Sequence, residues 1–98
     1  QDAWNPAVLR LIREVGLAGE LTKKPVGICG EAAADPILAV VLIGLGVTSL
    51  SMSPTALADV RAEISRFTLP EARELAERVL STRNAADART AASAVLTQ

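Results

Sequence analysis

The residue with the clearest chemical potential is Cys29, the single cysteine of a chain that contains no histidine. It ends a short apolar run and is followed directly by Gly30 and Glu31. A cysteine thiol in water is mostly protonated at neutral pH, so it can donate a proton to a reacting group. A free cysteine is also commonly buried as a small hydrophobic residue. The sequence leaves both roles open.

Other polar side chains lie close to Cys29 in the expected structure. Glu31 can be a surface charge, a helix-cap carboxylate or a group that orients a ligand. Ser49, Ser51 and Ser53 alternate along one face of a predicted strand, and we expect them to face the same way as Cys29. Their hydroxyl groups can meet a phosphate or a carboxylate, or they can satisfy nearby backbone groups.

Composition excludes several classes of function. Without histidine and with one cysteine, this stretch can hold no internal disulfide, usual zinc site, histidine-dependent triad or phosphohistidine. Ten basic and eleven acidic residues give a net charge of −1, which argues against a nucleic-acid partner. Residues 36–58 carry no charge, but only residues 37–47 are continuously apolar, which is too short for membrane insertion.

The elements that must position these residues begin with a helix predicted over residues 6–21. Asn5 is a typical N-cap residue, and Pro6 suits the first helical position. The helix has apolar residues at helical spacing, which we expect to form its buried face: Val8, Leu11, Ile12, Val15 and Ala18.

A βαβ unit is predicted next. Residues 25–29 form the first strand and residues 47–52 the second, with a buried apolar helix over residues 37–45 between them. Asp35 caps that helix. The two strands should be parallel and joined by a right-handed crossover, which puts Cys29 at a carboxyl strand end, where active sites of α/β proteins gather.

The rest of the chain is predicted to be helical. One helix starts near Pro54 and runs to about Arg66. A capping box of Thr68 and Glu71 opens another, and Asn84 opens the last. Because two strands alone leave both sheet edges unpaired, the chain should be a piece of a longer cytosolic protein.

Three segments, PVGICGEAAADP, VLIGLG and SLSMSP, resemble one family in their order and spacing. They are similar to the C-terminal end of the phosphoenolpyruvate–protein phosphotransferases, enzyme I of the bacterial sugar phosphotransferase system. The resemblance runs along the whole chain and is strongest over residues 25–54. Pyruvate phosphate dikinases and phosphoenolpyruvate synthases share a similar Cys-Gly-Glu segment.

The resemblance implies an α/β fold in which residues 1–98 are the C-terminal part of a phosphoenolpyruvate-binding domain. They would be the last two strands and flanking helices of a partial (β/α)8 TIM barrel, followed by C-terminal helices. It also implies that the parent enzyme transfers phosphate from phosphoenolpyruvate, through an enzyme histidine, to a histidine-containing phosphocarrier protein for sugar uptake in the cytoplasm. Cys29 would be the proton donor to the enolate.

The same resemblance implies a homodimeric parent that uses Mg²⁺, whose ligands lie outside this stretch, so the isolated chain should be inactive. Ala32 and Ala34 depart from the family, which usually has Met and Gly at these positions. Two alternatives remain open. The chain can be the end of a dikinase or synthase relative, or a non-catalytic helical dimerisation module in which Cys29 is a core residue.

Overall fold

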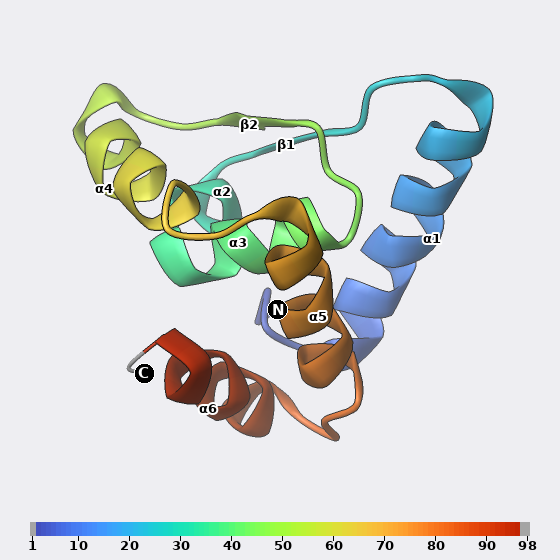
Figure 1. Cartoon of the computed structure of the whole chain (residues 1–98), viewed down its shortest axis with the longest axis vertical. Helices are drawn as coiled ribbons and strands as arrows, with labels where there is room; N and C mark the ends of the chain where they lie inside the picture. Colours follow the sequence, from blue (N-terminus) through green and yellow to red (C-terminus); the bar gives the residue numbers. More distant parts are fainter. Residues whose placement is uncertain (1, 97–98) are drawn as a thin grey trace.

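The computed structural model describes residues 2–96, which form a chain of short helices interrupted by two strands. Figure 1 shows the strands side by side along one side of the molecule, with the central helices beneath them. The elements in order are α1 (Pro6–Thr22), β1 (Gly27–Cys29), α2 (Glu31–Ala34), α3 (Pro36–Gly44), β2 (Ser49–Ser51), α4 (Pro54–Ile64), α5 (Leu69–Leu80) and α6 (Ala85–Leu96).

The helix starts confirm the predicted caps. The Asn5 side chain accepts a hydrogen bond from the Ala7 N–H, and the Asp35 carboxylate accepts from the N–H groups that follow it. Thr68 and Glu71 form the reciprocal capping box of α5. The hydrogen bond from the Thr68 backbone N–H to the Glu71 carboxylate, with a smaller contribution from the Thr68 side chain, lowers the pKa of Glu71.

The strands form the predicted parallel pair. Gly27 lies opposite Ser49, and Cys29 lies opposite Ser51. The residue between them on each strand, Ile28 or Leu50, packs against the hydrophobic core. One face of the sheet therefore rests on the core, and the other face carries Gly27, Cys29, Ser49 and Ser51, which are exposed.

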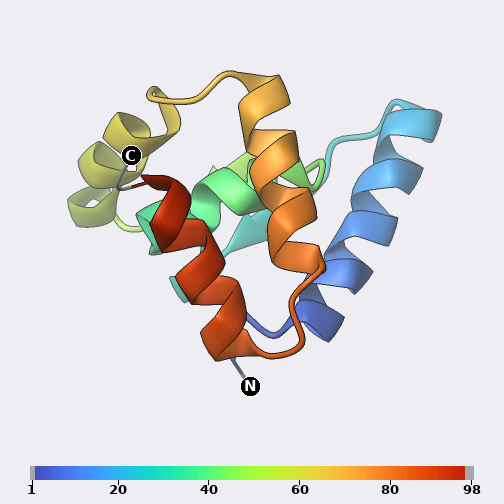
Figure 2. The same ribbon diagram turned by 60° about the horizontal axis from the view of Figure 1, so that its bottom comes forward.

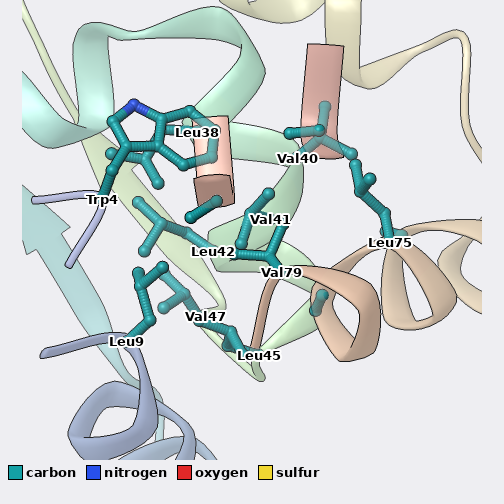
Figure 3. Packing of buried hydrophobic residues seen from close by; sticks show 14 residues of the cluster. Trp4, Leu9, Leu38, Val40, Val41, Leu42, Leu45, Val47, Leu75 and Val79 are labelled. Carbon is teal, nitrogen blue, oxygen red and sulfur yellow. The ribbon is translucent and has the colours of Figure 1, made fainter. Parts of the chain in front are cut away.

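The core surrounds α3, as its all-apolar sequence predicts. Its residues 38–42 are buried, and α3 packs against α4 and α5. Figure 3 shows Val41 and Leu42 of α3 close to Val79 of α5 and Leu9 of α1. The alanine-rich helix α6 packs on α5 and α3, and Figure 2 shows α5 and α6 side by side in front of α3.

The expected buried face of α1 is wrong in part. Leu11 is 68% exposed and Val15 is 54% exposed, whereas Leu9, Gly16 and Gly19 are buried. A Cβ atom at Gly16 would collide with the Leu45 carbonyl oxygen. Close backbone approach through glycine therefore determines which face of α1 packs inward. Leu11 and Val15 of the apolar stripe stay exposed, whereas Ile12 is partly buried against the core.

The expected part of a (β/α)8 barrel is also wrong for this chain. Within residues 2–96 the only sheet is the two-stranded pair of β1 and β2, and no barrel is present. A barrel closes only when each strand bonds to a neighbour on both edges. With two strands of three residues each, the structure is mainly helical. The proposed domain bounds of 1–98 also include residues 1, 97 and 98, which lie outside the described residues.

None of the helices described by the structure combines the length and the apolar character needed to cross a bilayer.

Candidate active site

The carboxyl ends of β1 and β2 meet at one edge of the molecule, where α2 and α4 begin (Figure 1). Cys29 is the last residue of β1, and its register partner Ser51 is the last residue of β2. Helix α2 contacts both β2 and α4 at this edge. We call this edge, formed by residues 29–34 and 51–55, the carboxyl edge.

Cys29 is exposed at the carboxyl edge with a free thiol. The core-residue alternative required this side chain to be buried among apolar neighbours, and in this structure it is not. The prediction that the serines within residues 49–53 share the face of Cys29 is confirmed for Ser49 and Ser51, since parallel partners in register point the same way. Ser53 lies beyond the end of β2. That face is open to solvent in this chain.

Gly30 fixes the direction in which the chain leaves Cys29. Its φ of 92° and ψ of −158° lie in a region that is essentially restricted to glycine. The next four residues form the short helix α2, which precedes the region where the sequence predicts a helix, residues 37–45. Strong helix propensity explains α2, because three of its four residues are alanine.

The side chains of α2 anchor the carboxyl edge to the core. Ala33 is fully buried, Ala32 is half-buried against the core, and Ala34 is half-buried. Glu31 is exposed at the first position of α2 and has no hydrogen bond to another described residue. Its carboxylate is therefore an exposed charge at the start of a helix, where the helix dipole favours it.

Trp4 contributes to this anchor, which the sequence analysis missed. The indole N–H of Trp4 donates to the Asp35 carboxylate at 3.2 Å. The same carboxylate caps α3 through the N–H groups of Ile37 and Leu38. Figure 3 shows the Trp4 ring beside Leu38. A buried indole usually finds an acceptor, but no pattern in the sequence identifies Asp35, which is 31 positions away.

The hydroxyl groups at the exposed sheet face differ in their partners. Those of Ser49 and Ser51 make no hydrogen bond to another described residue. The Ser53 hydroxyl lies 3.0 Å from the Thr55 hydroxyl and forms a hydrogen bond with it. Ser49 and Ser51 therefore keep their hydrogen-bonding capacity for solvent or for a ligand.

The described residues do not fit a magnesium ion. Mg²⁺ is bound through carboxylate and other oxygen ligands, and within residues 2–96 no three His, Cys, Asp or Glu side chains come together in a group that could hold a metal. At the carboxyl edge Glu31 is the single carboxylate with no bonding partner, and one exposed side chain does not make such a site.

Comparison with known proteins places this chain in a family. Residues 1–69 match the model of the PEP-utilising enzyme, PEP-binding domain, where PEP is phosphoenolpyruvate. This chain belongs to the PEP-utilising enzymes. The matched residues include both strands, the whole carboxyl edge and Cys29.

Curated relatives of this chain share a recurrent name. A phosphoenolpyruvate-protein phosphotransferase of Streptomyces coelicolor is 50% identical over 96 residues, which are 98% of this chain and 17% of the relative. That of Bacillus subtilis is 44% identical over 80% of this chain and 14% of the relative. A multiphosphoryl transfer protein of Rhodobacter capsulatus is 44% identical over 90% of this chain and 11% of the relative. The chain thus spans less than a fifth of each of these relatives.

Proposed function

We propose that this chain is the C-terminal part of a phosphoenolpyruvate–protein phosphotransferase and that Cys29 protonates the enolate formed in its reaction. The observation that carries the proposal is the position of the thiol. Cys29 is the exposed last residue of β1, within the residues that match the PEP-binding domain. The names of the relatives favour the phosphotransferase over the dikinase or synthase alternative.

The phosphoryl group of PEP passes to a histidine elsewhere in the whole enzyme, which breaks the bond between phosphorus and the enol oxygen. The pyruvate enolate that remains takes a proton at its methylene carbon from the Cys29 thiol, and the sulfur keeps the electron pair as a thiolate. A proton from water then restores the thiol. The phosphohistidine finally passes its phosphoryl group to a histidine-containing phosphocarrier protein.

Three features of the carboxyl edge support Cys29 as the donor. The thiol is not enclosed by neighbouring side chains. The backbone conformation of Gly30 and the burial of Ala33 in α2 fix the segment that directly follows Cys29. A general acid must be placed within reach of the atom that it protonates, and a fixed strand end meets that requirement better than a free loop.

The remaining parts of the proposal concern the whole enzyme. We propose that it works as a cytoplasmic homodimer and that it uses Mg²⁺. Since the described residues form no magnesium site, other parts of the enzyme would have to bind the ion.

The direct test is Cys29→Ala and Cys29→Ser in the whole enzyme. General acid catalysis typically contributes about 10²–10⁴-fold, so pyruvate formation should fall by about that factor where protonation limits turnover. PEP binding should change little. In deuterated water with stereospecifically labelled PEP, wild type should deliver the deuteron to one face of the enolate, and both variants should lose that selectivity.

The matched control is Ser65→Ala, which removes a small polar group at the end of α4, away from the carboxyl edge. It should keep wild-type turnover. Wild-type turnover and facial selectivity in Cys29→Ala would contradict the proposal.

Two further measurements separate the alternatives. Thiol labelling of the whole enzyme should be fast without PEP and slower with it. Equal labelling in both states would favour a non-catalytic module. Transfer of labelled phosphate from PEP to an adenine nucleotide instead of the carrier protein would favour a dikinase or synthase relative.

A further inference from the structure

A concave region lies at the opposite end of the sheet from Cys29. A cavity of about 630 Å³ is bounded by the second half of α1, the end of α3, the start of α5 and the segments that lead into β1 and β2. Figure 1 shows these elements around the ends of the strands that lie away from α2 and α4. We call this cavity the amino-end groove. Its volume is within the range of small-molecule pockets.

The wall of the amino-end groove is largely apolar. Leu17 of α1 and Leu69 of α5 line it and are 45% and 46% exposed, respectively. Ile43 of α3 and Val47 of the loop after α3 also line the cavity. Large apolar side chains that remain accessible in a concave site lose contact with water when a ligand with an apolar body fills it.

The rim of the amino-end groove is basic. Lys23, Lys24 and Arg73 line it and form no ion pair with another described residue. Glu20 is the single lining carboxylate without such a pair, since Glu77 is bound to Arg13 across the groove. Three unpaired cations against one unpaired anion favour an anionic ligand.

The amino-end groove shares none of its lining with the carboxyl edge. Its residues nearest to the strands are Pro25 and Thr48, which precede β1 and β2, whereas Cys29 and Ser51 end those strands. We propose that the amino-end groove binds a small organic anion with an apolar body, its hydrocarbon part against Leu17 and Leu69 and its carboxylate near Lys24 and Arg73.

The test is calorimetric titration of the whole enzyme with sodium octanoate, with 1-octanol and acetate as probes that lack the charge or the apolar body. Octanoate should bind at one site per chain and more tightly than either probe. Arg73→Gln and Lys24→Gln should each weaken octanoate binding by roughly two- to five-fold, as expected for partly exposed ion pairs. Arg61→Gln is the matched control, because Arg61 is an exposed arginine of α4 outside the groove.

Octanoate binding should survive Cys29→Ala and saturating PEP. Loss of binding with PEP would overturn the proposal, because octanoate would then occupy the PEP site. Equal binding of 1-octanol, or no effect of Arg73→Gln and Lys24→Gln, would also overturn it. Sedimentation tests a second copy of the chain as the occupant. If Arg73→Gln dissociates an oligomer and octanoate does not bind, the groove is a contact between copies and the proposal is wrong.

Discussion

The two ends of the small sheet differ in chemistry. The carboxyl edge carries a free thiol, exposed hydroxyl groups and one unpaired carboxylate, and neither of its segments, 29–34 and 51–55, contains a lysine or an arginine. The amino-end groove carries Lys23, Lys24 and Arg73 around an apolar wall. The Cys29 thiol and the unpaired cations of the groove are therefore at opposite ends of the same two strands.

This difference shows what the chain can contribute alone. Phosphoryl transfer depends on positive groups that neutralise the phosphate and on precise placement. The carboxyl edge carries a free thiol without such groups, and the groove carries cations away from that thiol. Under the proposed function, the groups that neutralise the phosphate would therefore have to lie outside the carboxyl edge of this chain.

The largest effect that we expect is the absence of phosphotransfer by the isolated chain. The purified 98-residue chain, mixed with PEP, Mg²⁺ and the carrier protein, should give no labelled carrier above background. The whole enzyme under the same conditions is the positive control. Labelled carrier protein from the isolated chain would show that the cations of this chain can serve the carboxyl edge, and that the separation of the two ends of the sheet does not prevent transfer.

Gly16→Ala should damage the packing of α1 near the amino-end groove. The new Cβ would collide with the Leu45 carbonyl oxygen, a backbone atom that cannot turn aside. We expect a loss of about 3 kcal/mol in the free energy of unfolding, at the upper end for overpacking. Val15→Ala, on the exposed side of the same helix, should change it by less than about 0.5 kcal/mol. Chemical unfolding at fixed protein concentration measures both, and equal losses would mean that Val15 also packs.

Gly30→Ala tests the carboxyl edge. There is open space for the new Cβ, but the positive φ of Gly30 strains any L side chain. We expect a loss of about 2 kcal/mol in stability and lower turnover of the whole enzyme, because Cys29 would shift. Ala34→Gly is the matched exchange in the same turn, and glycine in a helix costs only about 0.5–1 kcal/mol. Full turnover in Gly30→Ala would show that the backbone at Gly30 does not position the thiol.

Thr68→Ala should have the smallest effect, since it lies outside both regions. Loss of the N-cap hydroxyl should lower the stability by about 1 kcal/mol. The pKa of Glu71 is lowered in the folded chain from its ordinary value of 4.5. Its contribution to stability is therefore present above that value and is lost as the pH falls through the lowered pKa.

Unfolding of wild type and Glu71→Gln as a function of pH measures this contribution. The difference between them should be constant at neutral pH and should vanish in acid. A difference that persists well below the lowered pKa would show that the Glu71 charge is not its source.

Several features followed from the sequence because they depend on residues that are close together in the chain. The caps at Asn5, Asp35 and Thr68 join a side chain to backbone groups two or three positions away. The alternation along residues 27–29 and 49–51 placed Cys29, Ser49 and Ser51 on one face, because side chains on a strand alternate by rule. Motif order identified the family, which the match over residues 1–69 confirms.

Other features were decided only by tertiary packing. The inward face of α1 depends on how closely Gly16 approaches the loop after α3, and this close contact outweighs the apolar stripe that includes Leu11 and Val15. The Trp4 to Asp35 hydrogen bond and the gathering of Lys24 and Arg73 around one cavity join residues that are far apart in the chain. The expected barrel is absent for a tertiary reason as well, since each of the two strands forms backbone hydrogen bonds with a neighbouring strand on one edge only. Local hydrogen bonding and periodicity are thus determined by neighbouring residues, whereas close packing depends on which distant backbones can approach one another.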